Sequence, residues 1–238
     1  MRLLTLTTMV LFASLVTAKS TASVIQISNI NDSFLLNSHS IEGLFNNSSP
    51  FFTTDDLASV HSILNNWGID TDGKITLLPV NTGFGLSFLT LIDEEFGSGD
   101  NGTDGVLGLT STAPSTLSMF INDSDQDDWS LIQPPFGSQT MGSTFVWGSA
   151  GSGDGFAWAG LSLGDAFSYS FVGLDGDGGA IGTEAFQFVS WTGNSWDVVS
   201  TNGFKTDGSS VFTGMVVPAP GAALVLTALV VGRRRRHH

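Results

Sequence analysis

Cysteine is absent from this chain of 238 residues, and basic residues are few. Without cysteine there is no disulfide framework and no thiol nucleophile. The sequence also lacks a Gly-x-Ser-x-Gly elbow, a His-Glu-x-x-His pair and a phosphate-binding loop. Apart from the C-terminal pair, its histidines are His39 and His61. These absences leave catalysis without a recognisable motif, and the chain is predicted not to be an enzyme.

Positive charge is nearly missing from the central part of the chain. Of the 8 basic residues, only Lys74 and Lys205 lie between residues 23 and 216, whereas all 22 acidic residues lie there, so this part carries a formal charge of −20. Such a surface repels nucleic acid and anionic lipid, and neither is an expected partner. The 18 Phe and 6 Trp argue against disorder.

The N-terminus has the three parts of a secretory signal peptide. Met1 and Arg2 begin it with positive charge, an uncharged and mostly apolar run covers residues 3–16, and small residues ending in Ala18 and Ala22 supply two cleavage sites. The alternative is a retained anchor, but the apolar run is shorter than the ~20 residues that span a bilayer. We therefore expect residues 1–22 to form a signal helix that signal peptidase removes.

The C-terminus combines a proline motif, an apolar segment and a basic cluster. Pro218, Ala219 and Pro220 precede an almost purely apolar run at residues 222–232. Four arginines follow: Arg233, Arg234, Arg235 and Arg236. Because clustered arginines resist transfer across the membrane, they should hold the tail on the cytoplasmic side. The prolines should keep the junction extended and open to an enzyme.

These residues resemble the PEP-CTERM protein-sorting tails of Gram-negative bacteria, which carry Val-Pro-Glu-Pro, an apolar helix and an arginine cluster. Ala219 stands where that family usually has Glu, as in Pro-Ala-Pro variants of the tail. The resemblance is confined to residues 216–238. It implies a C-terminal transmembrane helix, processing by an exosortase-like membrane enzyme, and transfer from the inner membrane to the cell surface or extracellular matrix. A plain stop-transfer anchor is the alternative, but it has no need of the prolines.

Between the two ends, residues 23–215 are predicted to form one all-β domain, an antiparallel sandwich or jelly-roll with one short helix. The helix is expected at residues 53–67, where Thr53 can cap it and Asp56 completes a capping box. A first strand is expected at residues 24–28, and residues 29–50 read as a loop. Further runs rich in β-branched and aromatic residues predict strands at 75–80, 84–92, 116–121, 129–132, 144–147, 156–161, 167–172, 186–191, 196–199 and 211–216.

The densest acidic segment lies at residues 122–128. Asp123, Asp125 and Asp127 have the alternate spacing with which loop oxygens converge on Ca²⁺. However, Asp128 replaces the glycine of an EF-hand loop, and no glutamate stands at the twelfth position. The segment is therefore either a Ca²⁺ site or a solvated acidic turn.

Tryptophan suggests a second kind of site. Four tryptophans could form a platform for sugar rings or could belong to the core: Trp147, Trp158, Trp191 and Trp196. Trp129, beside the acidic segment, is expected to be the most exposed of the six tryptophans.

Three functions remain open from sequence alone. The first is an exported, non-catalytic cell-surface or extracellular-matrix protein, which requires no cofactor. The second is a secreted glycan-binding module, aided or not by Ca²⁺, with extracellular polysaccharide as its partner. The third is a carbohydrate-active hydrolase, which needs only two carboxylates, although nothing marks a pair.

Overall fold

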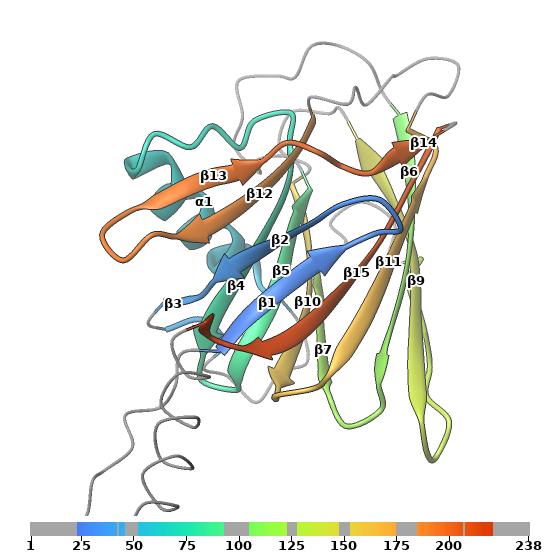
Figure 1. Ribbon diagram of the computed structural model, residues 1–238. Helices are drawn as coiled ribbons and strands as arrows, with labels where there is room; N and C mark the ends of the chain where they lie inside the picture. The colour runs from blue at the N-terminus through green and yellow to red at the C-terminus, as the bar shows by residue number, and fades with distance from the viewer. Residues whose placement is uncertain are drawn as a thin grey trace, which may run out of the picture.

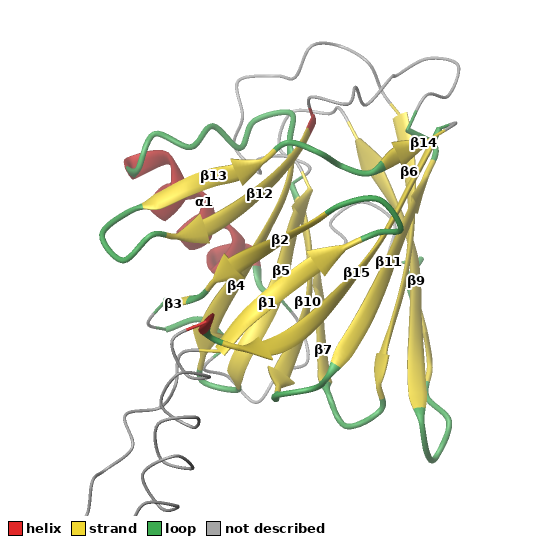
Figure 2. Cartoon of the chain, in the orientation of Figure 1, coloured by secondary structure: helices red, strands yellow, loops and turns green. Residues whose placement is uncertain are grey.

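The structure is a computed structural model that describes residues 23–41, 43–45, 52–92, 105–122, 128–147, 153–174, 185–206 and 208–220. Two β-sheets lie face to face, and helix α1 (Thr54–Asn66) packs on the outer side of one of them (Figures 1 and 2). The predicted β-sandwich with one short helix is therefore confirmed. Within the described residues, no helix has both the length and the apolar character needed to cross a membrane.

The first sheet, called sheet A, has 8 strands, and the pairs that it forms are antiparallel. Its order is β2 (Ser33–Asn37), β1 (Ser23–Ser28), β15 (Ser209–Pro218), β11 (Ala166–Val172), β6 (Gly105–Pro114), β9 (Ser138–Trp147) and β8 (Ser130–Ile132), with β14 (Lys205–Thr206) beside β15.

The second sheet, called sheet B, has 7 strands and is mixed. Its order is β13 (Trp196–Ser200), β12 (Phe186–Trp191), β4 (Ile75–Thr82), β5 (Gly85–Ile92), β10 (Asp154–Leu161) and β7 (Ser118–Asn122), with β3 (His39–Ser40) beside β4. The expectation of a wholly antiparallel fold is wrong here, because β4 runs parallel to both β12 and β3. These partners come from distant parts of the chain, so no hairpin sets their direction.

The main core fills the space between the sheets. Large rings from both sheets meet there, and Tyr169 is in aromatic contact with Phe88, Phe156 and Phe212. Two hydrogen bonds join polar groups within this core: Thr90 Oγ1 donates to Tyr169 Oη at 3.1 Å, and Trp158 Nε1 donates to Ser111 Oγ at 2.7 Å. Burial raises the pKa of Tyr169 above its ordinary value, so its hydroxyl stays protonated.

A second core lies between α1 and the outer face of sheet B. Leu57, Val60 and Leu64 form the buried stripe of the helix, and the predicted capping box is present, with Thr53 Oγ1 accepting from Asp56 N at 3.1 Å. Gly155 of β10 allows the close approach, since a Cβ there would stand 2.5 Å from Leu57 Cδ2. Sheet B is therefore covered on both faces, and its central strands are apolar on both.

Several predicted boundaries need correction. The expected loop at residues 29–50 contains β2 and β3, and residues 105–114, for which no strand was predicted, form β6. β9 begins at Ser138, six residues before the predicted start, and β15 extends to Pro218 rather than ending at residue 216.

Candidate functional site

The predicted sorting motif begins where the sandwich ends. Pro218 is the last residue of β15 and lies opposite Ser23, the first residue of β1. Pro218 and Pro220 are exposed, and Ala219 is half-buried. The cluster formed by Arg233, Arg234, Arg235 and Arg236 lies outside the described residues.

The predicted Ca²⁺ ligands Asp123, Asp125 and Asp127 also lie outside the described residues. Their neighbour Asp128 accepts a hydrogen bond from the backbone N of Thr144 at 3.1 Å, which ties the end of the acidic segment to β9. Among the residues that the structure describes, no three His, Cys, Asp or Glu side chains are grouped as a metal site would require.

The four predicted platform tryptophans do not share a surface. Trp158 is fully buried in the main core, and Trp196 is buried in the core beneath α1. The side chain of Trp147 is outside the described set. The prediction that Trp129 is the most exposed tryptophan is wrong, since it is half-buried against the main core and Trp67 is more exposed. Of the predicted four, Trp191 alone is described as partly accessible.

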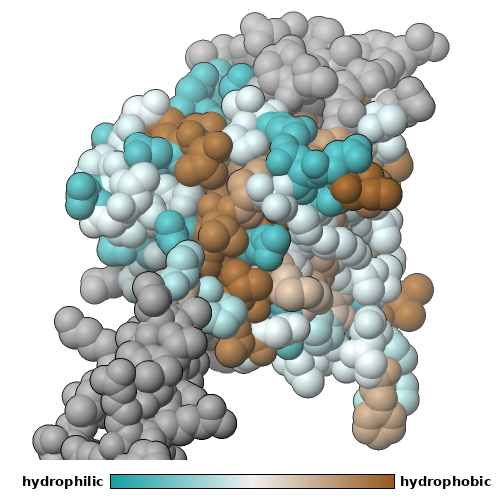
Figure 3. Space-filling view, in the orientation of Figure 1, coloured by the Kyte–Doolittle hydropathy of each residue, from teal (hydrophilic) through white to brown (hydrophobic). Residues whose placement is uncertain are grey.

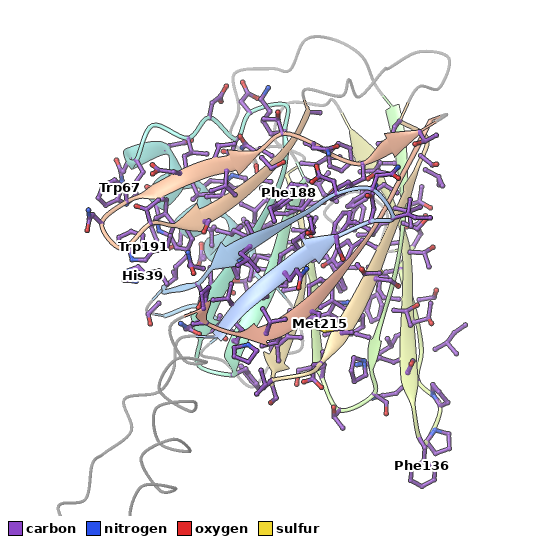
Figure 4. All side chains as sticks on the ribbon, viewed as in Figure 1. His39, Trp67, Phe136, Phe188, Trp191 and Met215 are labelled. Carbon is purple, nitrogen blue, oxygen red and sulfur yellow. The ribbon has the colours of Figure 1, made fainter. Side chains whose placement is uncertain are left out.

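Trp191 instead belongs to a different group, which we call the aromatic cluster: His39, Trp67, Trp191 and Trp196. The His39 ring stacks on Trp191 with centroids 3.9 Å apart and an interplanar angle of 7°. The Trp67 ring makes an angle of 84° with the Trp191 ring, with centroids 6.0 Å apart. The buried Trp196 ring also packs against Trp191, with centroids 5.6 Å apart. Trp67, Trp191 and His39 follow one another along the edge of the molecule (Figure 4).

Each member of the aromatic cluster is held by a separate element. His39 is in β3, and Trp191 ends β12 directly opposite Trp196 of β13. Trp67 is the C-cap of α1, where Gly68 takes a positive φ of 78° and Ile69 N donates to Leu64 O at 3.1 Å. The helix therefore ends at Trp67, where the chain turns, and the Trp67 side chain is 49% exposed.

The surroundings of the aromatic cluster carry amide and hydroxyl groups. Asn65 and Asn66 precede Trp67 and are exposed. On the other side, Asn81 Nδ2 donates to Ser38 Oγ at 3.1 Å, and Ser190 Oγ accepts from Asn37 N at 2.8 Å. Aromatic faces combined with amide and hydroxyl groups suit a ligand that has both apolar C–H faces and hydroxyls.

His61, the other histidine singled out in the sequence, lies in the helix beneath. It is buried, and its Nδ1 is 2.9 Å from Thr71 Oγ1, whereas Nε2 has no hydrogen-bond partner. Burial lowers its pKa to about 4. His61 is therefore a neutral core residue at pH 7, as its position between Leu57 and Leu64 predicts.

Comparison with known proteins adds no assignment. No family model matches the chain, and neither the curated proteins nor the solved structures contain a significant match.

Proposed function

We propose that this chain is an exported, non-catalytic protein of the cell surface or extracellular matrix, released after both of its ends are removed. The pairing of β1 with β15 carries the proposal, because Ser23 lies opposite Pro218 and the first and last strands of the domain therefore end side by side (Figure 1). The described residues of both cores lie between positions 25 and 216. Cleavage outside these strands would thus leave both cores intact.

The proposed route follows from the chemistry of the ends. A signal helix at residues 1–22 directs export, and signal peptidase cleaves after it. A transmembrane helix in the segment 216–238, retained by Arg233–Arg236, then holds the folded domain at the outer side of the inner membrane. An exosortase-like enzyme cuts near Pro218-Ala219-Pro220. Because β15 continues to Pro218, the cut should fall at or beyond this residue to preserve the strand.

Deleting residues 2–22 should keep the protein inside the cell, because the export signal is lost. Fractionation of the host with an antibody against the folded domain measures this. The full chain should be found in the membrane and extracellular fractions, and the shortened chain in the cytoplasm. Equal amounts of both chains in the extracellular fraction would contradict the proposal.

A second candidate function is binding of a neutral extracellular polysaccharide, which the aromatic cluster favours. The half-exposed Trp67 beside the His39–Trp191 stack offers ring surface to the C–H face of a sugar, and nearby amides can bond its hydroxyls. The charge of the chain favours neutral over acidic polymers. The geometry of the described residues lends no support to the hydrolase alternative, which is not proposed.

Trp67→Ala should weaken retardation of the protein in gels containing a soluble neutral β-glucan, mannan or xylan by roughly 10-fold, the change that corresponds to a loss of about 1.4 kcal/mol of ring stacking. Trp67→Phe should retain part of the binding. Phe136→Ala is the matched control, because Phe136 is 88% exposed at the far end of the molecule (Figure 4). Retardation that Trp67→Ala leaves unchanged, or that no polymer produces, would exclude this function.

A further inference from the structure

The outer face of sheet A has no cover within the described part of the chain. On sheet B, α1 buries the outward side chains of β4, β5 and β10. On sheet A, by contrast, buried and accessible positions alternate along β15 and β11, as in a sheet with one face toward solvent. The two sheets therefore differ in what lies over them, and the outer face of sheet A is accessible.

This accessible face carries no charge. Its accessible outward positions on six strands are Ser33, Leu35 and Asn37 of β2, Gln26 and Ser28 of β1, Ser209, Val211, Thr213, Met215 and Val217 of β15, Ala166, Ser168, Ser170 and Val172 of β11, Gly108, Thr110 and Thr112 of β6, and Thr140, Gly142 and Thr144 of β9. Val24 of β1 lies on the same side but is buried. Asp32 and Asp165 lie in turns at its margins, and Asp128 lies at its β9 edge, where it accepts from the backbone N of Thr144. In a chain with 22 acidic residues, this neutrality sets the face apart from the rest of the surface.

A row of hydroxyls crosses the middle of the face. The strand registers align Ser28, Thr213, Ser168, Thr112 and Thr140. Neighbours in the row bond to each other, with Ser28 Oγ 3.2 Å from Thr213 Oγ1 and Thr112 Oγ1 3.2 Å from Thr140 Oγ1. Their hydrogen-bonding capacity is thus partly satisfied within the sheet, which lowers the cost of removing them from water.

Large apolar side chains accompany the hydroxyls. Leu35, Val172, Val211 and Met215 are between 42% and 53% exposed. An open groove of about 480 Å³ adjoins Val211 and Thr213, and almost fully exposed Ile30 forms part of its wall. Figure 3 shows the surface over β15, β11 and β9 as mainly pale, neither strongly hydrophilic nor strongly hydrophobic.

We propose that this face binds the same face of a second copy of the chain, giving a symmetric dimer in which two A sheets pack face to face. Electrostatics favour this face for contact between two copies, because the repulsion between two strongly acidic molecules is weakest where the surfaces that meet lack acidic groups. A two-fold axis along the hydroxyl row places this row against itself, and sets the apolar side chains on one side of the row against those on its other side.

The size of the face fits this partner. Six strands spaced about 4.8 Å apart, each about 20 Å long, span roughly 600 Å² in projection. Accessible surface exceeds projected area, so the face is comparable with the ~800 Å² that each partner contributes to a standard interface. Facing sheets pack ~10 Å apart, which brings opposing hydroxyls and valines into contact.

The absence of cysteine permits a direct test on the full chain, solubilised in a mild detergent. Single cysteines are introduced along the hydroxyl row: Ser28→Cys, Thr213→Cys, Ser168→Cys, Thr112→Cys and Thr140→Cys. With copper phenanthroline as oxidant, at least one variant close to the two-fold axis should form a disulfide-linked dimer in high yield on a non-reducing gel. Val198→Cys, at an exposed position of β13, should remain monomeric.

Sedimentation velocity provides the second readout. The wild type should form dimers more readily at high salt, because screening weakens the repulsion between the two acidic molecules. Thr213→Asp should shift the equilibrium to monomer by at least ~10-fold, whereas Val198→Asp should not, because only the first places like charges across the interface. Wild-type monomer at about 100 µM, or cross-linking no higher than that of Val198→Cys, would overturn the proposal.

Discussion

Replacing both prolines of the sorting motif by leucine, Pro218→Leu with Pro220→Leu, should leave the protein anchored in the membrane and unprocessed. The change lengthens the apolar run and lets the membrane helix begin closer to β15. The enzyme then has no extended segment between folded strand and helix. We expect the extracellular form to fall at least ~10-fold and the membrane form to accumulate, as quantified by immunoblots of the two fractions.

The chain contains a matched control for this experiment. Pro134 and Pro135 are exposed in the loop between β8 and β9, so Pro134→Leu with Pro135→Leu makes the same chemical change away from the tail. This variant should be released normally. Serine in place of Arg233–Arg236 should have the opposite effect to the motif change, because unprocessed chain is then no longer retained. Normal release of the Pro218/Pro220 variant would count against cleavage at the motif.

Acid should destabilise the domain through His61. Burial places the pKa of folded His61 at about 4, below its ordinary value of 6.5, so folding favours the neutral ring. Its contribution to stability is therefore complete above pH 6.5 and is lost as the pH falls toward 4. Between pH 7.5 and 4.5 the loss should be roughly 2–3 kcal/mol, measurable by urea unfolding at the two pH values.

The control for this prediction is His61→Asn, which retains a polar group near Thr71 but cannot titrate in this range. The variant should be less stable than the wild type at pH 7.5, because it fills the buried site less well. However, its stability should change less between the two pH values. An equal decrease in both proteins would assign the pH dependence to carboxyl groups instead.

The sheet elements with strong apolar patterns could be predicted from sequence. Residues 186–191 form β12 as expected, and the capping box of Thr53 and Asp56 is present because its contacts are local. β2, β6 and the first half of β9 were not predicted. In β6 and β9 the outward positions hold Ser, Thr and Gly, so the apolar density of each strand is low. The apolar residues of β2 lie within a segment rich in Asn and Ser, which is typical of a loop.

The order of the strands depends on pairs far apart in the chain. Ser23 lies opposite Pro218, and the parallel β4–β12 pair joins Ile75 to Phe186. A strand pattern specifies which side chains share a face but not the neighbouring strand. These pairings therefore could not be derived from periodicity.

The candidate site was missed for a related reason. Trp196 and Trp191 lie opposite each other on β13 and β12 and point to the same side of sheet B, yet one is buried and the other partly accessible. The difference arises from α1 and from His39, which come from other parts of the chain. One signal was available: Trp67 lies at the end of the predicted helix, just before Gly68, where a side chain can extend beyond the face that the helix buries.

The most direct test of the proposed export and processing is the intact mass of the protein recovered from the extracellular fraction of its host. We expect a chain that begins after Ala18 or Ala22 and ends between Pro218 and Pro220. This product contains every strand from β1 to β15. A mass showing that most of the extracellular protein still carries Arg233–His238 would contradict it.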